Sequence, residues 1–131
     1  MRCYKLAASL GNRIFLDSRL KEVNFGTWEN QAWDNIPKKE IDPWMNDFVD
    51  TAPPNGESYT ELQNRVIDFF KTLVANNKEN DPIFIVSHAG PIRAWLSYIQ
   101  QIALKDSFSI KINYGQICKL QYINDDFVIK S

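Results

Sequence analysis

The chain has 131 residues, of which 44% are hydrophobic, 24% charged and 13% aromatic, and its formal net charge is −1. This length corresponds to a single domain with its own hydrophobic core, which we expect to cover residues 1–131. The balanced charge excludes a general binder of nucleic acids or anionic membranes, because those partners require a concentrated basic surface. No apolar run reaches membrane-spanning length, no signal-peptide core follows Met1, and the two cysteines form no disulfide framework. We therefore expect a reduced cytoplasmic protein.

The first fifty residues are predicted to form short helices, one possible strand and a loop. The pattern predicts a helix over residues 2–10, followed by a C-capping pair at Gly11 and Asn12. The apolar run 14–16 is consistent with a strand, and residues 17–30 are predicted to form a loop. The following segment, 31–49, predicts short helices, and prolines interrupt it at two places. These prolines are Pro37 and Pro43.

The most regular pattern predicts a helix over residues 59–77. A turn at 53–56 precedes it, with the sequence Pro-Pro-Asn-Gly. Ser58 stands three residues before Glu61, which is the capping-box spacing at a helix N-terminus. Apolar residues then recur at helical spacing, so one face of this helix is expected to lie in the core.

A buried strand and a further helix are predicted next. Residues 83–86 have the sequence Ile-Phe-Ile-Val after a turn at 80–82, which favours a strand covered on both faces in a parallel sheet. The strand would end at Ser87, and a helix would then continue to about Leu104. Helices interleaved with a buried strand indicate an α/β sandwich.

The end of the chain predicts a β-hairpin. Residues 116–123 and 127–129 alternate between apolar and polar side chains around a turn sequence. The turn residues are Asn124, Asp125 and Asp126.

His88 lies where the predicted strand meets the helix. Ligands in open α/β sheets bind at the carboxyl ends of strands, and the free N–H groups of a helix N-terminus favour an anion. Gly90 would let a ligand approach the backbone closely. His88 could therefore donate to a phosphate oxygen, or its imidazole could simply bond a nearby carbonyl group in a capped turn. Both interpretations remain open from these residues alone.

Glu22 is the second candidate. A carboxyl group beside Val23 and Phe25 can be partly desolvated, which suits it to proton donation. Taken alone, a solvated Glu22 that pairs with Arg19 or Lys21 is the favoured interpretation. The aromatic residues between positions 33 and 48 are interpreted as packing. They are Trp33, Trp44 and Phe48.

Four short motifs occur in the order and approximate spacing of the histidine phosphatase superfamily, the phosphoglycerate mutase-like group. They are Arg2-Cys3, the tract from Leu20 to Glu29, Gly56-Glu57-Ser58 and Ser87-His88-Ala89-Gly90. The chain resembles this superfamily over essentially its whole length. The aromatic-rich tract from Phe25 to Ser58 is most similar to the alpha-ribazole phosphatase branch, whose members remove the 5′-phosphate of alpha-ribazole phosphate in cobalamin assembly.

The resemblance implies a three-layer α/β/α sandwich of the phosphoglycerate mutase-like type and assigns roles to four residues. Arg2 would hold a phosphate oxygen, and His88 would stabilise the charge that develops on the phosphoryl oxygens. Glu22 would protonate the leaving ribose oxygen and then activate water. Glu57 would lie near the phosphate. The substrate would be a small phosphorylated molecule, and the family mechanism needs no metal or other cofactor.

The sequence departs from the family at its nucleophile, a histidine in an Arg-His-Gly motif at the end of the first strand. The only histidine here is His88, which matches the second histidine of the family. We therefore expect an N-terminally truncated fold and negligible phosphatase activity in this chain alone. The uncovered edge of the strand over 83–86 would favour self-association. A non-catalytic phosphate-binding homologue and a relic fragment remain as alternatives.

Overall fold

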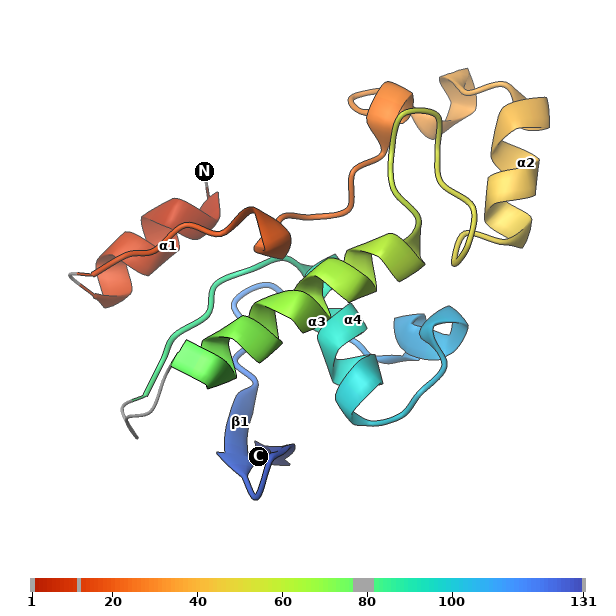
Figure 1. The fold of residues 1–131 in the computed structure, drawn as a ribbon. Helices are drawn as coiled ribbons and strands as arrows, with labels where there is room; N and C mark the ends of the chain where they lie inside the picture. Colours follow the sequence, from red (N-terminus) through yellow and green to blue (C-terminus); the bar gives the residue numbers. More distant parts are fainter. Residues whose placement is uncertain (1, 12, 77–81, 131) are drawn as a thin grey trace.

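The computed structural model describes residues 2–11, 13–76 and 82–130, and four helices and one hairpin form its regular structure (Figure 1). The helices are α1 (Arg2–Leu10), α2 (Lys38–Asn46), α3 (Tyr59–Asn76) and α4 (Ala89–Ile99). The strands are β1 (Lys119–Ile123) and β2 (Asp126–Lys130). Short 3-10 turns lie between them at Ser18–Leu20, Gly26–Trp28, Trp33–Asn35 and Leu104–Ser109.

The predicted helix over 2–10 is confirmed, and that over 59–77 is confirmed as far as Asn76, since residue 77 lies outside the described residues. The second helix begins as its sequence indicates. The Ser58 hydroxyl accepts a hydrogen bond from the Glu61 N–H at 3.1 Å, and the Glu61 carboxylate accepts one from the Ser58 N–H at 3.1 Å. This reciprocal pair satisfies two backbone donors at the start of α3. Asn12 of the first predicted cap, and residues 80–81 of a predicted turn, lie outside the described residues.

The predicted hairpin is also confirmed. β1 and β2 pair antiparallel, with Lys119 opposite Lys130 and Ile123 opposite Asp126. Asn124 and Asp125 have φ angles of 52° and 65°, which suit the two-residue turn that joins twisted strands. The turn therefore uses two residues rather than the predicted three.

The core lies where α3, α4 and the hairpin meet. The Phe70 ring of α3 stacks on the Trp95 ring of α4, with centroids 3.8 Å apart and planes 6° apart. Phe127 of β2 meets the edges of both rings, at 5.6 Å and 5.0 Å. Leu62 is fully buried in the same cluster. Because the start of α4 is anchored by this packing, the residues at its N-terminus have a rigid support.

Two predicted strands are not formed. Residues 82–88 and the run 14–16 are extended but belong to no sheet, and the only sheet among the described residues is the two-stranded hairpin. Phe15 is 83% exposed and Phe84 is 70% exposed. A strand requires a neighbour for its backbone groups, and the described residues supply none to either segment. The three-layer sandwich is therefore not assembled by this part of the chain.

Two helix boundaries also differ from the prediction. Pro43 does not break a helix but lies inside α2, where the short helix tolerates the missing N–H. The predicted helix after His88 ends at Ile99 rather than near Leu104. Gln101 takes a φ angle of 58° just beyond that end, so the chain turns into the 3-10 segment Leu104–Ser109.

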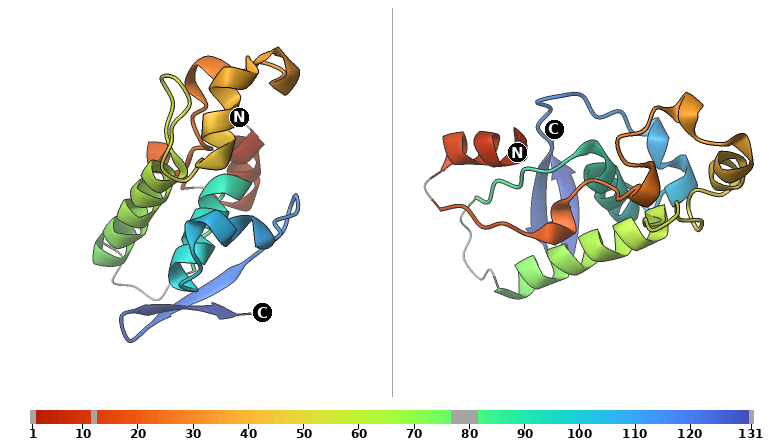
Figure 2. Two further views of the ribbon diagram at one scale, coloured as in Figure 1. Left: turned by 90° about the vertical axis from the view of Figure 1, so that its right-hand side faces the viewer. Right: turned by 90° about the horizontal axis from the view of Figure 1, so that it is seen from above.

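α1 and α2 lie at opposite ends of the molecule, and α3 runs between them beside α4 (Figures 1 and 2). The segment Ser18–Leu20 lies against α3, and the loop that carries Glu22 contacts the first turn of α4. No helix in the described ranges is long and apolar enough to cross a membrane.

Candidate active site

His88 is the residue that precedes α4. Its backbone is extended, with φ −114° and ψ 167°, and its carbonyl oxygen accepts the N–H of Ile92 at 3.1 Å. The side chain makes no capping hydrogen bond and is half-buried. The neighbouring Ser87 hydroxyl donates to the Leu20 carbonyl at 2.7 Å. This bond joins the start of α4 to the loop that carries Glu22.

Glu22 lies against the first turn of α4. Its Oε2 accepts a hydrogen bond from the Gly90 N–H at 3.3 Å, and its Oε1 accepts one from the Val23 N–H at 2.9 Å. A Cβ atom at position 90 would collide with Oε1 of Glu22, so glycine is required for this approach. The structure thus brings Glu22 to the same helix start as His88, as the superfamily resemblance implies.

The N-terminus of α1 reaches His88 from the other side. The Cys3 sulfur lies 3.6 Å from Nε2 and 3.9 Å from Nδ1 of His88, and its thiol donates to the Ser87 carbonyl at 3.4 Å. Arg2 directly precedes Cys3 and begins α1. Its backbone is therefore next to the His88 turn, while its side chain lies outside the described residues.

Glu57 is held beside the Glu22 loop by backbone contacts. The Glu57 N–H donates to the Asn24 carbonyl at 2.9 Å, and the Asn24 N–H donates to the Glu57 carboxylate at 3.0 Å. Gly26 makes this approach possible, because it has a φ of 59° and a Cβ there would collide with the Pro54 carbonyl. The loops before and after α2 are therefore fixed to each other.

Arg65 is the residue that sequence reasoning missed. Its guanidinium donates to both Glu57 oxygens, at 2.6 Å and 3.1 Å, to the Arg19 carbonyl at 2.7 Å and to the Glu22 carbonyl at 3.2 Å. Both side chains of the ion pair are largely buried. Helical spacing gave no signal for this pair, because Glu57 precedes the helix that carries Arg65. Cys3 and Ser87 were not assigned contacts either, and no local pattern reveals them.

An open cleft of about 590 Å³ lies beside these groups. Glu22, Glu29 and Glu57 line it, against the two cations Lys21 and Arg65. The Arg65 charge is already paired with Glu57, so the cleft is acidic overall. His88 does not line this cleft and stands at the other side of the Glu22–Gly90 contact.

Tyr59 connects this region to the core. Burial raises the pKa of the Tyr59 phenol, and the negative charge of Glu22 raises it further, while Arg93 opposes both. The Arg93 guanidinium lies 5.6 Å from the centre of the Phe108 ring and donates to the Ile110 carbonyl at 2.9 Å.

In the described part of the chain, no three histidine, cysteine, aspartate or glutamate side chains are grouped so as to hold a metal ion.

The arrangement can place an anion against backbone N–H groups and a histidine, with a carboxyl group beside it. A family model described as histidine phosphatase superfamily (branch 1) matches residues 2–131. A protein from Shigella boydii named as a probable phosphoglycerate mutase, GpmB, is 38% identical over 121 residues, which are 89% of this chain and 55% of that protein. The chain spans between about a half and three fifths of the length of the first curated relatives it matches.

Solved structures share this fold. The alpha-ribazole phosphatase of Shigella flexneri superposes with a TM-score of 0.84 at 19% identity, over 95% of this chain and 63% of that one. A mycobacterial glucosyl-3-phosphoglycerate phosphatase in complex with inorganic phosphate gives a TM-score of 0.77 at 21% identity, over 99% of this chain and 71% of that one. At these identities the likeness shows the fold alone.

Proposed function

Because the chain belongs to branch 1 of the histidine phosphatase superfamily, we propose that its site binds the phosphate of a phosphomonoester. The phosphate would lie at the N-terminus of α4, where the helix dipole favours an anion and where the Gly90 N–H, now bonded to Glu22, could donate to it. His88 would donate to one phosphate oxygen, and Arg2 would hold another through its guanidinium fork.

The observation that carries the proposal is the position of Glu22 on the Gly90 N–H. A carboxyl group at that place stands within reach of the oxygen that leaves from a phosphate bound beside it. Glu22 would protonate this oxygen and later activate water. Glu57 would act less directly, because its carboxylate is held by Arg65 and by the Asn24 N–H. It would fix the loop that carries Glu22.

We take alpha-ribazole 5′-phosphate as the substrate, which would place the protein in cobalamin assembly in the cytoplasm. The aromatic-rich tract from Phe25 to Ser58 and the fold shared with an alpha-ribazole phosphatase support this choice. The 131-residue polypeptide contains His88 and no other histidine. Since the family mechanism passes through a phosphohistidine on a different histidine, this polypeptide assayed alone should hydrolyse the substrate negligibly. Loss of a nucleophile costs about a million-fold in turnover.

A second candidate is a phosphate-binding protein without chemistry. The phosphatase and the non-catalytic binding protein differ in their need for Glu22. An ionised carboxylate repels a phosphate bound beside it, so a protein that only binds phosphate gains nothing from this residue. The test is a calorimetric titration of the chain with inorganic phosphate. Glu22→Gln should bind more tightly and His88→Gln more weakly, while Glu40→Gln on α2 serves as the matched control.

Unchanged phosphate affinity in both variants would contradict the proposed site. Weaker binding in His88→Gln with no gain in Glu22→Gln would favour the binder. Steady hydrolysis of alpha-ribazole 5′-phosphate that disappears in His88→Ala would contradict the expected inactivity.

The extended segments support a proposal about assembly. Ile83 and Phe84 at one segment, and Phe15 and Leu16 at the other, are largely exposed apolar side chains. Their backbones lack sheet partners among the described residues, and such segments readily pair with further strands. We expect a second copy of the chain to cover them and extend a sheet between the helices. Sedimentation at increasing concentration should show a dimer, which Phe84→Lys should weaken, whereas a monomer throughout would contradict it.

A further inference from the structure

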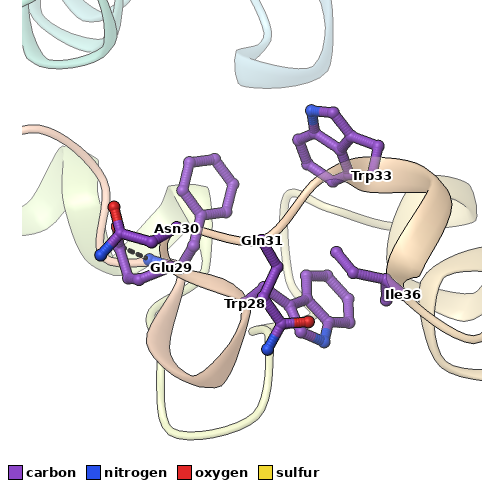
Figure 3. A pocket seen from close by; sticks show the side chains of 7 residues that line it. Trp28, Glu29, Asn30, Gln31, Trp33 and Ile36 are labelled. Carbon is purple, nitrogen blue, oxygen red and sulfur yellow. Dashed lines mark hydrogen bonds between the residues drawn. The ribbon is translucent and has the colours of Figure 1, made fainter.

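A pocket of about 190 Å³ lies beside the acidic cleft, on the segment between Gly26 and α2 (Figure 3). Aromatic and aliphatic side chains form most of its wall, and polar groups lie at one side. Its lining residues are Phe25, Trp28, Glu29, Asn30, Gln31, Trp33 and Ile36. Phe25 and Glu29 also line the cleft that contains Glu22, so the two spaces adjoin.

The aromatic walls are held in place by Trp44. Trp33 stacks on it at 5.7 Å with planes 24° apart, and Trp28 meets it edge to face at 5.7 Å. Phe25 contacts both Trp33 and Trp44 at about 6 Å. Trp28 is buried, whereas Trp33 is 53% exposed. A rigid tryptophan that keeps half of its surface open offers a preformed stacking surface for a flat ring.

The size of the pocket limits what can fill it. A cavity of roughly 150 Å³ in another protein accommodates benzene, so 190 Å³ fits one ring or a fused pair of rings rather than a whole substrate. The pocket therefore suits a single flat group, with the remainder of the ligand in the adjoining cleft.

Glu29, Asn30 and Gln31 form the polar side of the pocket, and Glu29 and Gln31 present acceptors there. Gln31 uses its amide nitrogen to donate to the Thr27 carbonyl at 2.9 Å, and Glu29 uses one oxygen to accept the Phe25 N–H at 2.9 Å. The Gln31 carbonyl oxygen and the second Glu29 oxygen accept no hydrogen bond from the described residues. Together with the Glu22 carboxylate in the cleft, these groups favour a neutral hydrogen-bond donor over a carboxylate.

We infer that this pocket binds the alcohol part of the substrate, and that this part carries a flat, uncharged ring with an N–H or O–H donor. Small phosphomonoesters that bear a carboxylate are disfavoured at the same site. The inference rests on the proposed phosphomonoester site and names its substrate class.

The test uses the whole chain labelled with 15N and follows the indole N–H signals of its four tryptophans. Indole is the neutral probe and indole-5-carboxylate is the charged one, both added without phosphate. Indole should shift the Trp28 and Trp33 signals. The Trp95 signal should not change, because the Trp95 ring is stacked on Phe70 in the core. The carboxylate should bind at least fivefold more weakly.

Trp33→Ala should weaken indole binding by about fivefold, because it removes the stacking surface. Phe15→Ala removes an exposed ring far from the pocket and should change nothing. Glu29→Gln keeps the acceptor to Phe25 and should strengthen binding of the carboxylate more than that of indole. Equal affinity for the two probes, or a Trp95 shift as large as that of Trp33, would overturn the inference.

The outcomes separate this inference from the proposed function. If the chain binds inorganic phosphate in a manner that depends on His88 but does not bind indole, the inference about the ring pocket is wrong and the proposed phosphate site stands. Binding of indole without binding of phosphate would overturn the proposed function and leave a ring pocket of another purpose.

Discussion

The Glu22 carboxylate accepts a hydrogen bond from the Gly90 N–H at 3.3 Å, which joins a loop near the start of the chain to the first turn of α4. The dipole of α4 stabilises a negative charge there. The same N–H groups would bind a phosphate, so an ionised Glu22 and a phosphate compete for one place. Phosphate binding at the Gly90 N–H should therefore require that the Glu22 carboxylate move off this donor.

The close approach of Glu22 to Gly90 can be measured by a double-mutant cycle. Gly90→Ala should displace the Glu22 carboxylate, because the new methyl group collides with its Oε1, and the loss of the hydrogen bond from the N–H of residue 90 should lower the free energy of unfolding. In a Glu22→Ala background the same change should be neutral or stabilising, since alanine favours the helix. Urea unfolding should give a coupling free energy of about 1 kcal/mol or more. Additive effects would show that the two residues do not touch in solution.

Arg65 should stabilise the site loops through four hydrogen bonds. Arg65→Met should lower the free energy of unfolding by about 2–3 kcal/mol, because it leaves the largely buried Glu57 carboxylate without its partner. Arg65→Lys should recover little, since lysine cannot reproduce the forked geometry.

Arg19→Met is the matched control for Arg65→Met. Arg19 also binds two carboxylates, but their side chains are more exposed than that of Glu57, at 69% for Asp68 and 25% for Asp17 against 15% for Glu57. Arg19→Met should therefore lower the free energy of unfolding by less than Arg65→Met does. Equal decreases in the two variants would contradict the stabilising role of Arg65.

Local patterns predicted the elements whose contacts lie close together in sequence. The start of α3 followed from Ser58 and Glu61, and the hairpin followed from alternation around Asn124 and Asp125. The run 83–86 has the composition of a buried strand, but a strand forms only against a neighbour. Its pairing is non-local, so composition could not determine the outcome.

The candidate site was only partly predictable for the same reason. Glu22 and His88 each had an ordinary structural explanation, and their meeting at α4 became an expectation only through the superfamily resemblance. The contact of Arg65 with the Glu22 carbonyl and that of Cys3 with His88 join segments far apart in the chain. The roles assigned to Arg2, Glu22, Glu57 and His88 remain predictions.

The capping box should contribute measurably to stability. Ser58→Ala removes the side-chain acceptor of the Glu61 N–H and should lower the free energy of unfolding by about 1 kcal/mol. Glu61→Gln keeps an oxygen for the Ser58 N–H and should cost clearly less. Thermal and urea unfolding would measure both. A loss in Glu61→Gln as large as in Ser58→Ala would contradict the reciprocal arrangement.

Tyr59 should make the chain sensitive to alkaline pH. Burial and the Glu22 charge raise the pKa of the Tyr59 phenol above its usual value of about 10, so the folded state holds this proton more tightly than the unfolded state does. The contribution of Tyr59 is therefore constant below about pH 10 and is lost as the pH rises further.

Tyr59→Phe keeps the ring in the core and should reduce the fall in the free energy of unfolding between pH 9 and pH 11. Tyr4→Phe makes the same change at an exposed site on α1 and should follow the wild type. Glu22→Gln removes a neighbouring negative charge, so NMR titration of 13C-labelled tyrosine should show a lower Tyr59 pKa in this variant. A Tyr59 pKa that does not respond to Glu22→Gln would contradict the placement of the Glu22 carboxylate near the Tyr59 phenol.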